Sequence, residues 1–120
     1  MLNLDTHVLL HALTGDLTRR EAALLEGEPW SISDIVIWEV SKLAELGRIE
    51  LDLDDPGLTR TLARVQVWLI TLDVCRAIRT LDFRGDPADE IIAATSIVHQ
   101  VPLVTRDRWI RRSRRVPLAR

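Results

Sequence analysis

Two acidic residues follow short apolar runs at opposite ends of the sequence. The run LNL leads into Asp5, and the run LVTR leads into Asp107. Either acid alone could cap a following helix, which is a common role for aspartate. If both runs are strands of one parallel sheet, however, both acids lie at its carboxyl edge, where ligands bind in such folds. The sequence thus leaves two interpretations open: helix caps, or a shared ligand site.

A third acid, Glu39, lies in the middle of the apolar segment IVIWEVSKL. Its helical neighbours include Ile35, Val36 and Leu43, so it projects from a largely apolar face and no helix end requires it. A buried glutamate is rare unless it is paired or bound to a metal. The alternative partner is Lys42, close by on the same helix. We favour a functional role for Glu39.

The segment GDPADEIIAATS supplies two more acids. Asp86 and Pro87 fit a helix N-cap followed by a first-turn proline, so we interpret Asp86 as mainly structural. Asp89 begins the apolar stripe that faces the sheet, and it would therefore point to the same edge as Asp5. Asp73, after the apolar run 67–72, is interpreted as a helix cap.

Four of these carboxylates, Asp5, Glu39, Asp89 and Asp107, are therefore predicted to converge on one cleft. Two unit charges about 4 Å apart repel by about 4 kcal/mol at an effective dielectric constant near 20, so such a cluster is costly without a cation. Carboxylate oxygens are the ligands that Mg²⁺ and Mn²⁺ prefer. The single cysteine, Cys75, excludes a disulfide framework and a thiolate zinc site. The three histidines are interpreted as structural.

Short apolar strands alternate with helical patterns along the chain, which predicts a mostly parallel sheet between two layers of helices. We expect this α/β fold to be a single domain over residues 1–120. The expected strands cover residues 2–5, 30–33, 67–72 and 102–105, with an edge strand in the VPL segment near the C-terminus. The expected helices cover residues 17–26, 34–46, 57–66, 74–82, 87–99 and 107–113, after a first helical pattern around 8–13.

Charge is distributed unevenly although the net charge is only −2. Residues 106–120 carry seven arginines against Asp107, whereas the rest of the chain is acidic. This asymmetry indicates either a polyanion partner or a solvated helical face. No window is apolar enough for a membrane span, no signal peptide is evident, and a cytoplasmic location is expected.

Four segments in order resemble the motifs of one family. They are LDTHVLLHALTGD, WEVSKLAELGRIEL, DPADEIIAATS and PLVTRD. Together they are similar to the PIN-domain ribonucleases, and most similar to the VapC-like toxins of bacterial toxin–antitoxin pairs. The resemblance covers nearly the whole chain. One departure is Glu90, where related toxins often carry arginine after the third acid.

The resemblance implies a three-layer α/β/α PIN-like fold, a homodimer, and Mg²⁺- or Mn²⁺-dependent endonucleolytic cleavage of RNA. It also implies a cognate antitoxin that neutralises the enzyme. The metal-binding and catalytic residues would be Asp5, Glu39, Asp89 and Asp107. The expected substrate-binding residues, taken from this resemblance and from the basic segment, are Thr6, Thr105, Arg106, Arg108, Arg111 and Arg112, with Ser33 near the site.

Two other functions would account for part of the sequence. A haloacid-dehalogenase-type phosphotransferase also places an aspartate after the first strand, but it needs a second aspartate where this chain has His7. A non-catalytic PIN-like domain that binds RNA or protein would use the same acids as caps and surface charge. A thermal response to Mg²⁺ or Mn²⁺ separates the enzyme from the non-catalytic domain.

Overall fold

The computed structural model describes all 120 residues and contains a four-stranded, entirely parallel sheet in the order β3-β2-β1-β4. The strands are β1 (Leu2–Leu4), β2 (Trp30–Ser33), β3 (Gln66–Trp68) and β4 (Leu103–Val104). β1, the first element of the chain, lies inside the sheet between β2 and β4. The acids that follow β1 and β4 therefore belong to neighbouring strands.

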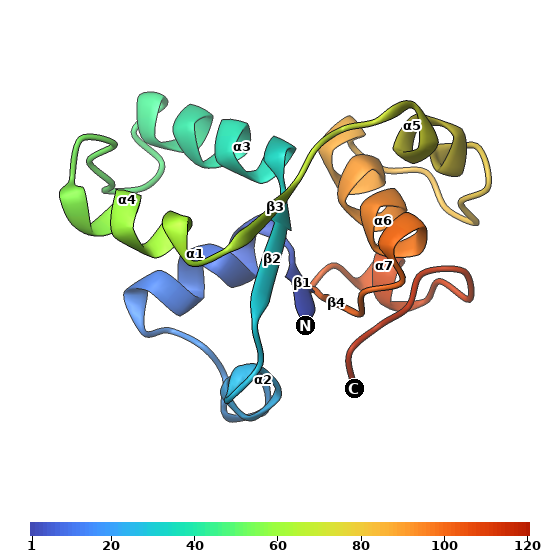
Figure 1. Ribbon diagram of the computed structural model, residues 1–120, viewed down its shortest axis with the longest axis horizontal. Helices are drawn as coiled ribbons and strands as arrows, with labels where there is room; N and C mark the ends of the chain where they lie inside the picture. The colour runs from blue at the N-terminus through green and yellow to red at the C-terminus, as the bar shows by residue number, and fades with distance from the viewer.

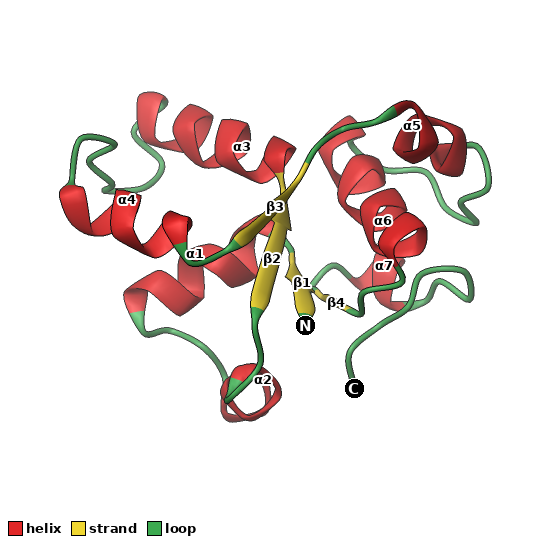
Figure 2. Cartoon of the chain, viewed as in Figure 1, coloured by secondary structure: helices red, strands yellow, loops and turns green.

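Helices cover both faces of this sheet, which confirms the predicted three-layer α/β/α architecture. Figures 1 and 2 show α1, α3 and α4 on one side of the strands and α5, α6 and α7 on the other. The helices are α1 (Thr6–Thr14), α2 (Arg19–Leu25), α3 (Asp34–Glu45), α4 (Pro56–Ala63), α5 (Leu72–Ile78), α6 (Pro87–His99) and α7 (Arg108–Arg111). None of these helices is long and apolar enough to cross a membrane.

The two longest helices begin and end where their local sequence predicts. The Ser33 hydroxyl accepts a hydrogen bond from the Ile35 amide and caps α3, while Gly47 follows the helix with a left-handed φ of 71°. α6 spans the predicted range 87–99. Asp86 occupies its N-cap position, but its side chain makes no capping hydrogen bond. The structural role predicted for Asp86 is therefore filled only by its backbone carbonyl, which accepts from the Glu90 amide.

The strand predicted over residues 67–72 is shorter than expected. β3 ends at Trp68 because its partner β2 ends opposite it, at Ser33, where α3 begins. Beyond that point no strand is available to pair with Leu69. The predicted cap is also wrong, because α5 begins at Leu72 and the Thr71 hydroxyl accepts from the Val74 amide.

The edge of β4 is covered by the C-terminal segment, as predicted for VPL. Leu118 forms a parallel bridge with Leu103, whose amide donates to the Pro117 carbonyl and whose carbonyl accepts from the Ala119 amide. The C-terminal segment therefore adds a single bridge at the outer edge of β4, the strand that leads to Asp107.

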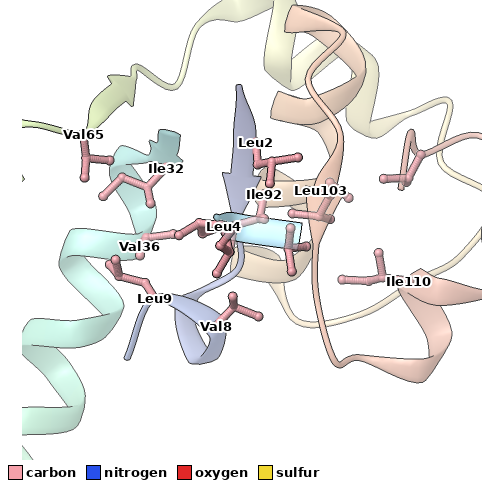
Figure 3. Packing of buried hydrophobic residues seen from close by; sticks show 14 of the residues in the cluster. Leu2, Leu4, Val8, Leu9, Ile32, Val36, Val65, Ile92, Leu103 and Ile110 are labelled. Carbon is pink, nitrogen blue, oxygen red and sulfur yellow. The ribbon is translucent and has the colours of Figure 1, made fainter. Parts of the chain in front are cut away.

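A cluster of 16 buried apolar residues fills the space between the sheet and the helices. Leu4, Ile32 and Leu103 come from three neighbouring strands, and Ile92 comes from α6 (Figure 3). Truncating a side chain such as Ile92 to alanine in such a core costs about 2–5 kcal/mol. This core fixes α6 against β1, and thereby fixes the elements that carry the acidic residues.

Candidate functional site

The four predicted acids come from four elements that meet at the carboxyl edge of the sheet. Asp5 directly follows β1, and Asp107 lies three residues after β4. Glu39 lies in the second turn of α3, and Asp89 is the third residue of α6. In the pairing of β1 with β4, Leu4 lies opposite Val104, so Asp5 is level with Thr105 and Asp107 follows two residues later.

The pKa of Asp89 is raised by its burial and by the neighbouring carboxylates. Its burial raises the pKa of its carboxyl to about 7, and the negative charges of Asp5, Asp107 and Glu39 contribute in that order. Asp86 adds the smallest of these effects. Desolvation and like charges both disfavour a carboxylate, so the pKa of Asp89 rises for two physical reasons with the same sign. Asp5, Asp107 and Glu39 therefore lie close enough to Asp89 to affect its carboxyl.

Asp5 is buried, with 6% of its surface exposed, and both of its oxygens are engaged. Oδ1 accepts from the Thr6 amide at 2.8 Å, so the predicted capping role is present. Oδ2 accepts from the Thr105 hydroxyl at 2.6 Å. The helix cap and the shared site are therefore compatible interpretations of the same residue.

Thr6 connects the first acid to the second. Its hydroxyl donates to Glu39 Oε1 at 2.5 Å, which joins the start of α1 to the middle of α3. Lys42, the alternative partner considered for Glu39, instead pairs with Glu45 at 3.5 Å. Glu39 therefore has a hydroxyl partner and no cationic partner within the chain.

Asp107 is held by the short helix that it begins. Its Oδ1 accepts from the Trp109 and Ile110 amides, and its own amide donates to the Thr105 hydroxyl. Its Oδ2 makes no hydrogen bond to the chain. Asp107 thus combines a capping oxygen with an oxygen left available for a ligand.

The residues present fit a hard divalent cation. Only oxygen donors gather here, and both Asp89 oxygens, Glu39 Oε2 and Asp107 Oδ2 make no hydrogen bond within the chain. No three acidic, histidine or cysteine side chains are close enough to surround one ion directly. That spacing suits Mg²⁺, which usually keeps several waters and contacts one or two carboxylates.

Two polar contacts that position the site were not anticipated from the sequence. The side-chain amide Nδ2 of buried Asn3 donates to Ser96 Oγ at 2.9 Å and to the Ile92 carbonyl at 3.4 Å. These bonds connect β1 to α6. An asparagine within the apolar run LNL was the available signal. Asn3 fixes the strand that carries Asp5 against the helix that carries Asp89.

The second unanticipated contact is a bidentate ion pair between Glu21 and Arg106. Arg106 Nε and Nη2 donate to the two Glu21 oxygens at 2.7 and 2.6 Å. The hydrogen bond from Arg106 lowers the pKa of Glu21 to about 2 against the opposing effect of burial. Glu21 also completes a capping box with Thr18, and this local role gave no indication of its distant partner.

The predicted substrate-binding residues fall into different environments. Thr6 and Thr105 are buried beside the acids, whereas Arg106 is engaged by Glu21. Arg108, Arg111 and Arg112 are exposed, and the Arg112 guanidinium lies 5.4 Å from the centre of the Trp109 ring. Only these three arginines of the predicted set are without an acidic partner.

The remaining residues near the site have local roles. Ser33 is fully buried and caps α3. Glu90 Oε2 accepts from the Gly85 amide at 3.4 Å, in the turn before α6. His99, at the other end of α6, stacks on Trp68 with ring centroids 4.0 Å apart, which supports its interpretation as structural.

Comparisons with known proteins agree with this architecture. Residues 3–115 match the PIN domain family. The chain is 36% identical over 95 residues to ribonuclease VapC22 of Mycobacterium tuberculosis, covering 77% of this chain and 73% of that protein.

Solved structures with the same fold include two assemblies at low sequence identity. A chain of VapBC2 from Rickettsia felis, solved bound to a DNA fragment from its promoter, has a TM-score of 0.72 with 18% identity, covering 98% of this chain and 97% of that one. A chain of a toxin–antitoxin complex from Klebsiella pneumoniae has a TM-score of 0.67 with 23% identity, covering 89% and 87%.

Proposed function

The chain belongs to the PIN domain family, and on that basis we propose that it is a VapC-type, metal-dependent endoribonuclease that hydrolyses phosphodiester bonds in RNA. The observation that carries this proposal is the placement of Asp5, Glu39, Asp89 and Asp107 where β1, β4, α3 and α6 meet at the carboxyl edge of the sheet. The pKa of Asp89, raised to about 7 by burial first and then by the charges of Asp5, Asp107 and Glu39, supports it. Strongly perturbed carboxylates that cluster in this way are typical of functional sites.

In the proposed mechanism, Asp5, Glu39, Asp89 and Asp107 hold Mg²⁺ or Mn²⁺, directly or through water. A bound divalent cation would polarise the scissile phosphate, activate a water and stabilise the leaving oxygen. Thr6 and Thr105 keep Glu39 and Asp5 in place through their hydroxyl groups. Deprotonation of the attacking water would need the cation or a carboxylate of the cluster, because no histidine side chain hydrogen-bonds to these acids.

A cognate antitoxin is the proposed regulatory partner. The similar structures named above include a toxin–antitoxin complex and a VapBC2 assembly. An apolar cavity of about 270 Å³ between α1, α3 and α4, lined by Leu9, Leu13 and Val40 among others, supports a protein partner on this face.

We also propose that the chain forms a homodimer. Trp38, Leu69 and Leu72 are apolar yet 58%, 66% and 64% exposed. The Ile70 amide donates to Asp34, which joins the start of α3 to the connection between β3 and α5. Apolar residues exposed on joined elements indicate a contact surface.

The decisive experiment measures cleavage of RNA in EDTA, Mg²⁺ and Mn²⁺, beside the Asp5→Asn protein. We expect cleavage only with a metal and only by the wild type. The same samples separate the enzyme from a non-catalytic domain by melting temperature. A metal site should raise the melting temperature on addition of Mg²⁺ or Mn²⁺, and Asp5→Asn should remove most of that increase. A domain whose acids are only caps would show neither effect.

A further inference from the structure

A second cavity lies beside β4, outside the acidic cluster, and is rich in arginine. Its volume is about 260 Å³. α2 and the C-terminal segment, which both contribute to it, lie in the lower part of Figure 1. Its lining includes an apolar group, Leu24, Leu103 and Leu118, and the four arginines Arg20, Arg106, Arg111 and Arg120. Arg20 comes from α2, and the other three arginines come from the basic segment 106–120.

Charge in this cavity is not balanced within the protein. The one acid in the lining, Glu21, is already bound by both donors of the Arg106 guanidinium. Arg20, Arg111 and Arg120 form no ion pair with any acid. Cations gathered around one hollow repel one another, and an anionic group in the hollow would relieve that repulsion.

The cavity adjoins the proposed active site through Thr105 and Arg106. Buried Thr105 lines the cavity and also donates its hydroxyl to Asp5. Exposed Arg106 also lines the cavity and directly precedes Asp107, so a strand of nucleic acid whose scissile phosphate lies at the acids can continue over Arg106 into the cavity. The arginines would compensate for the repulsion between the four carboxylates and the phosphates of that strand.

We infer that this cavity binds a nucleotide of the RNA strand next to the cleaved bond, with its phosphate on Arg20 and Arg111. This inference rests on the proposed ribonuclease function. The volume of about 260 Å³ is below the range of drug-sized ligand pockets, about 300–1,000 Å³, so the cavity holds at most a small part of the strand. An arginine guanidinium can donate two hydrogen bonds to the oxygens of one phosphate. Unstacked bases of single-stranded RNA can stack on guanidinium planes and pack against apolar side chains.

The test compares two double variants with equal loss of charge. In Arg20→Gln/Arg111→Gln both changed residues line the cavity, whereas in Arg19→Gln/Arg115→Gln the changed residues are exposed neighbours in sequence that do not line it. Binding of a short fluorescein-labelled single-stranded RNA is measured by anisotropy in EDTA across a salt series, so that no cleavage occurs. Melting curves check that both variants fold.

The cavity variant should bind the RNA about tenfold more weakly at low salt than the control variant. Its salt dependence should be shallower than that of the wild type by about 0.7 in the log–log slope, because the contact with one phosphate of the single strand is lost. Equal affinities and slopes for the two variants would overturn the inference. So would binding of a poly-glutamate peptide with the same dependence on Arg20 and Arg111, because the cavity would then recognise acidic peptide.

Failure of this inference is distinct from failure of the proposed function. If the wild type cleaves RNA with Mg²⁺ or Mn²⁺ but the two variants bind alike, only the cavity assignment is lost. If no RNA is cleaved under any metal condition, the proposed function is lost, while the binding comparison still decides whether the cavity takes RNA. A wild type that binds no RNA in EDTA overturns the cavity assignment.

Discussion

Thr105 donates its hydroxyl hydrogen bond to Asp5, a residue 100 positions earlier in the chain, at 2.6 Å. The same hydroxyl oxygen accepts from the Asp107 amide at 3.0 Å. One small side chain therefore connects the acid after β1 with the acid after β4. Because Thr105 is buried, no water competes for these bonds, and the relative position of the two acids depends on them.

Thr105→Val should reduce RNA cleavage by about 10²-fold, because misplacing a reacting group by about 1 Å has effects of this size. Loss of the hydroxyl also leaves Asp5 Oδ2 without its donor, which should lower the free energy of unfolding by about 1–3 kcal/mol. Thr105→Ser keeps the hydroxyl and should restore most of the activity. Single-turnover cleavage and denaturant unfolding measure the two effects.

The matched control for that experiment is Thr95→Val. Thr95 is also buried, but its hydroxyl donates to the Ile91 carbonyl of its own helix and does not contact an acid of the site. Thr95→Val should keep near wild-type cleavage per folded molecule. If Thr105→Val were as active as this control, Thr105 would have no positioning role.

Asp5→Asn should reduce RNA cleavage below detection while the protein stays folded. Asparagine keeps one carbonyl oxygen that can accept from the Thr6 amide, but it removes the negative charge. Asp54→Asn, which changes an exposed acid before α4, is the control and should stay active. Full activity of purified Asp5→Asn would discard the assignment of this acid.

Stability should fall as the pH rises through the range set by Asp89. Its folded pKa of about 7 is above the ordinary value of 3.8, so the folded state binds this proton more tightly than the unfolded state. Stability is therefore lost between about pH 4 and pH 7 and stays low above that range. Asp89→Asn removes this dependence and should stabilise the metal-free protein more at about pH 8 than at about pH 5.

Urea unfolding of wild type and Asp89→Asn at the two pH values checks this prediction. Asp73→Asn serves as the control because Asp73 is exposed and pairs only with Arg76 on its own helix. A stabilisation by Asp89→Asn that is the same at both pH values would contradict the electrostatic origin assigned to it.

The Glu21–Arg106 pair should make the fold sensitive to strong acid. The pKa of Glu21 is lowered from 4.5 to about 2, so its contribution is present above pH 4.5 and is lost as the pH falls toward 2. With allowance for solvent screening at Arg106, whose side chain is 37% exposed, the contribution is about 2 kcal/mol. Glu21→Gln should lower the free energy of unfolding by a similar amount at neutral pH.

Glu45→Gln gives the comparison for an exposed ion pair. The Lys42–Glu45 bridge is 3.5 Å long with side chains 47% and 68% exposed, so its loss should change stability by less than about 0.5 kcal/mol. If Glu21→Gln and Glu45→Gln lowered the free energy of unfolding equally, burial would contribute nothing to the stability gained from the Glu21–Arg106 pair.

Local patterns in the sequence were sufficient to predict the bounds of α3 and α6 to within one residue, but not the start of α5. The cap at Ser33, the proline at the start of α6 and the apolar run before Asp107 each depend on neighbouring residues alone. Glu39 is half-buried and has a hydrogen-bonding partner, whereas its role as a metal ligand stays a prediction. Its partner, Thr6, is 33 residues away and could not be identified from spacing.

Features that depend on pairing between distant segments were not predictable in the same way. The length of β3 is set by where β2 ends, so the apolar run 67–72 alone overestimates it. Arg106 was grouped with the other arginines of its segment because nothing nearby in sequence indicates Glu21. In both cases, tertiary contacts override the local signal.

The interior position of β1 has a consequence for synthesis on the ribosome. β1 pairs with β2 on one side and with β4 on the other, and β4 is synthesised about a hundred residues later. A nascent polypeptide that stops short of residue 103 has neither that neighbour nor Asp107. Under the proposed function, such an unfinished chain lacks one of the four acids, so RNA cleavage begins only after β4 and Asp107 have been synthesised.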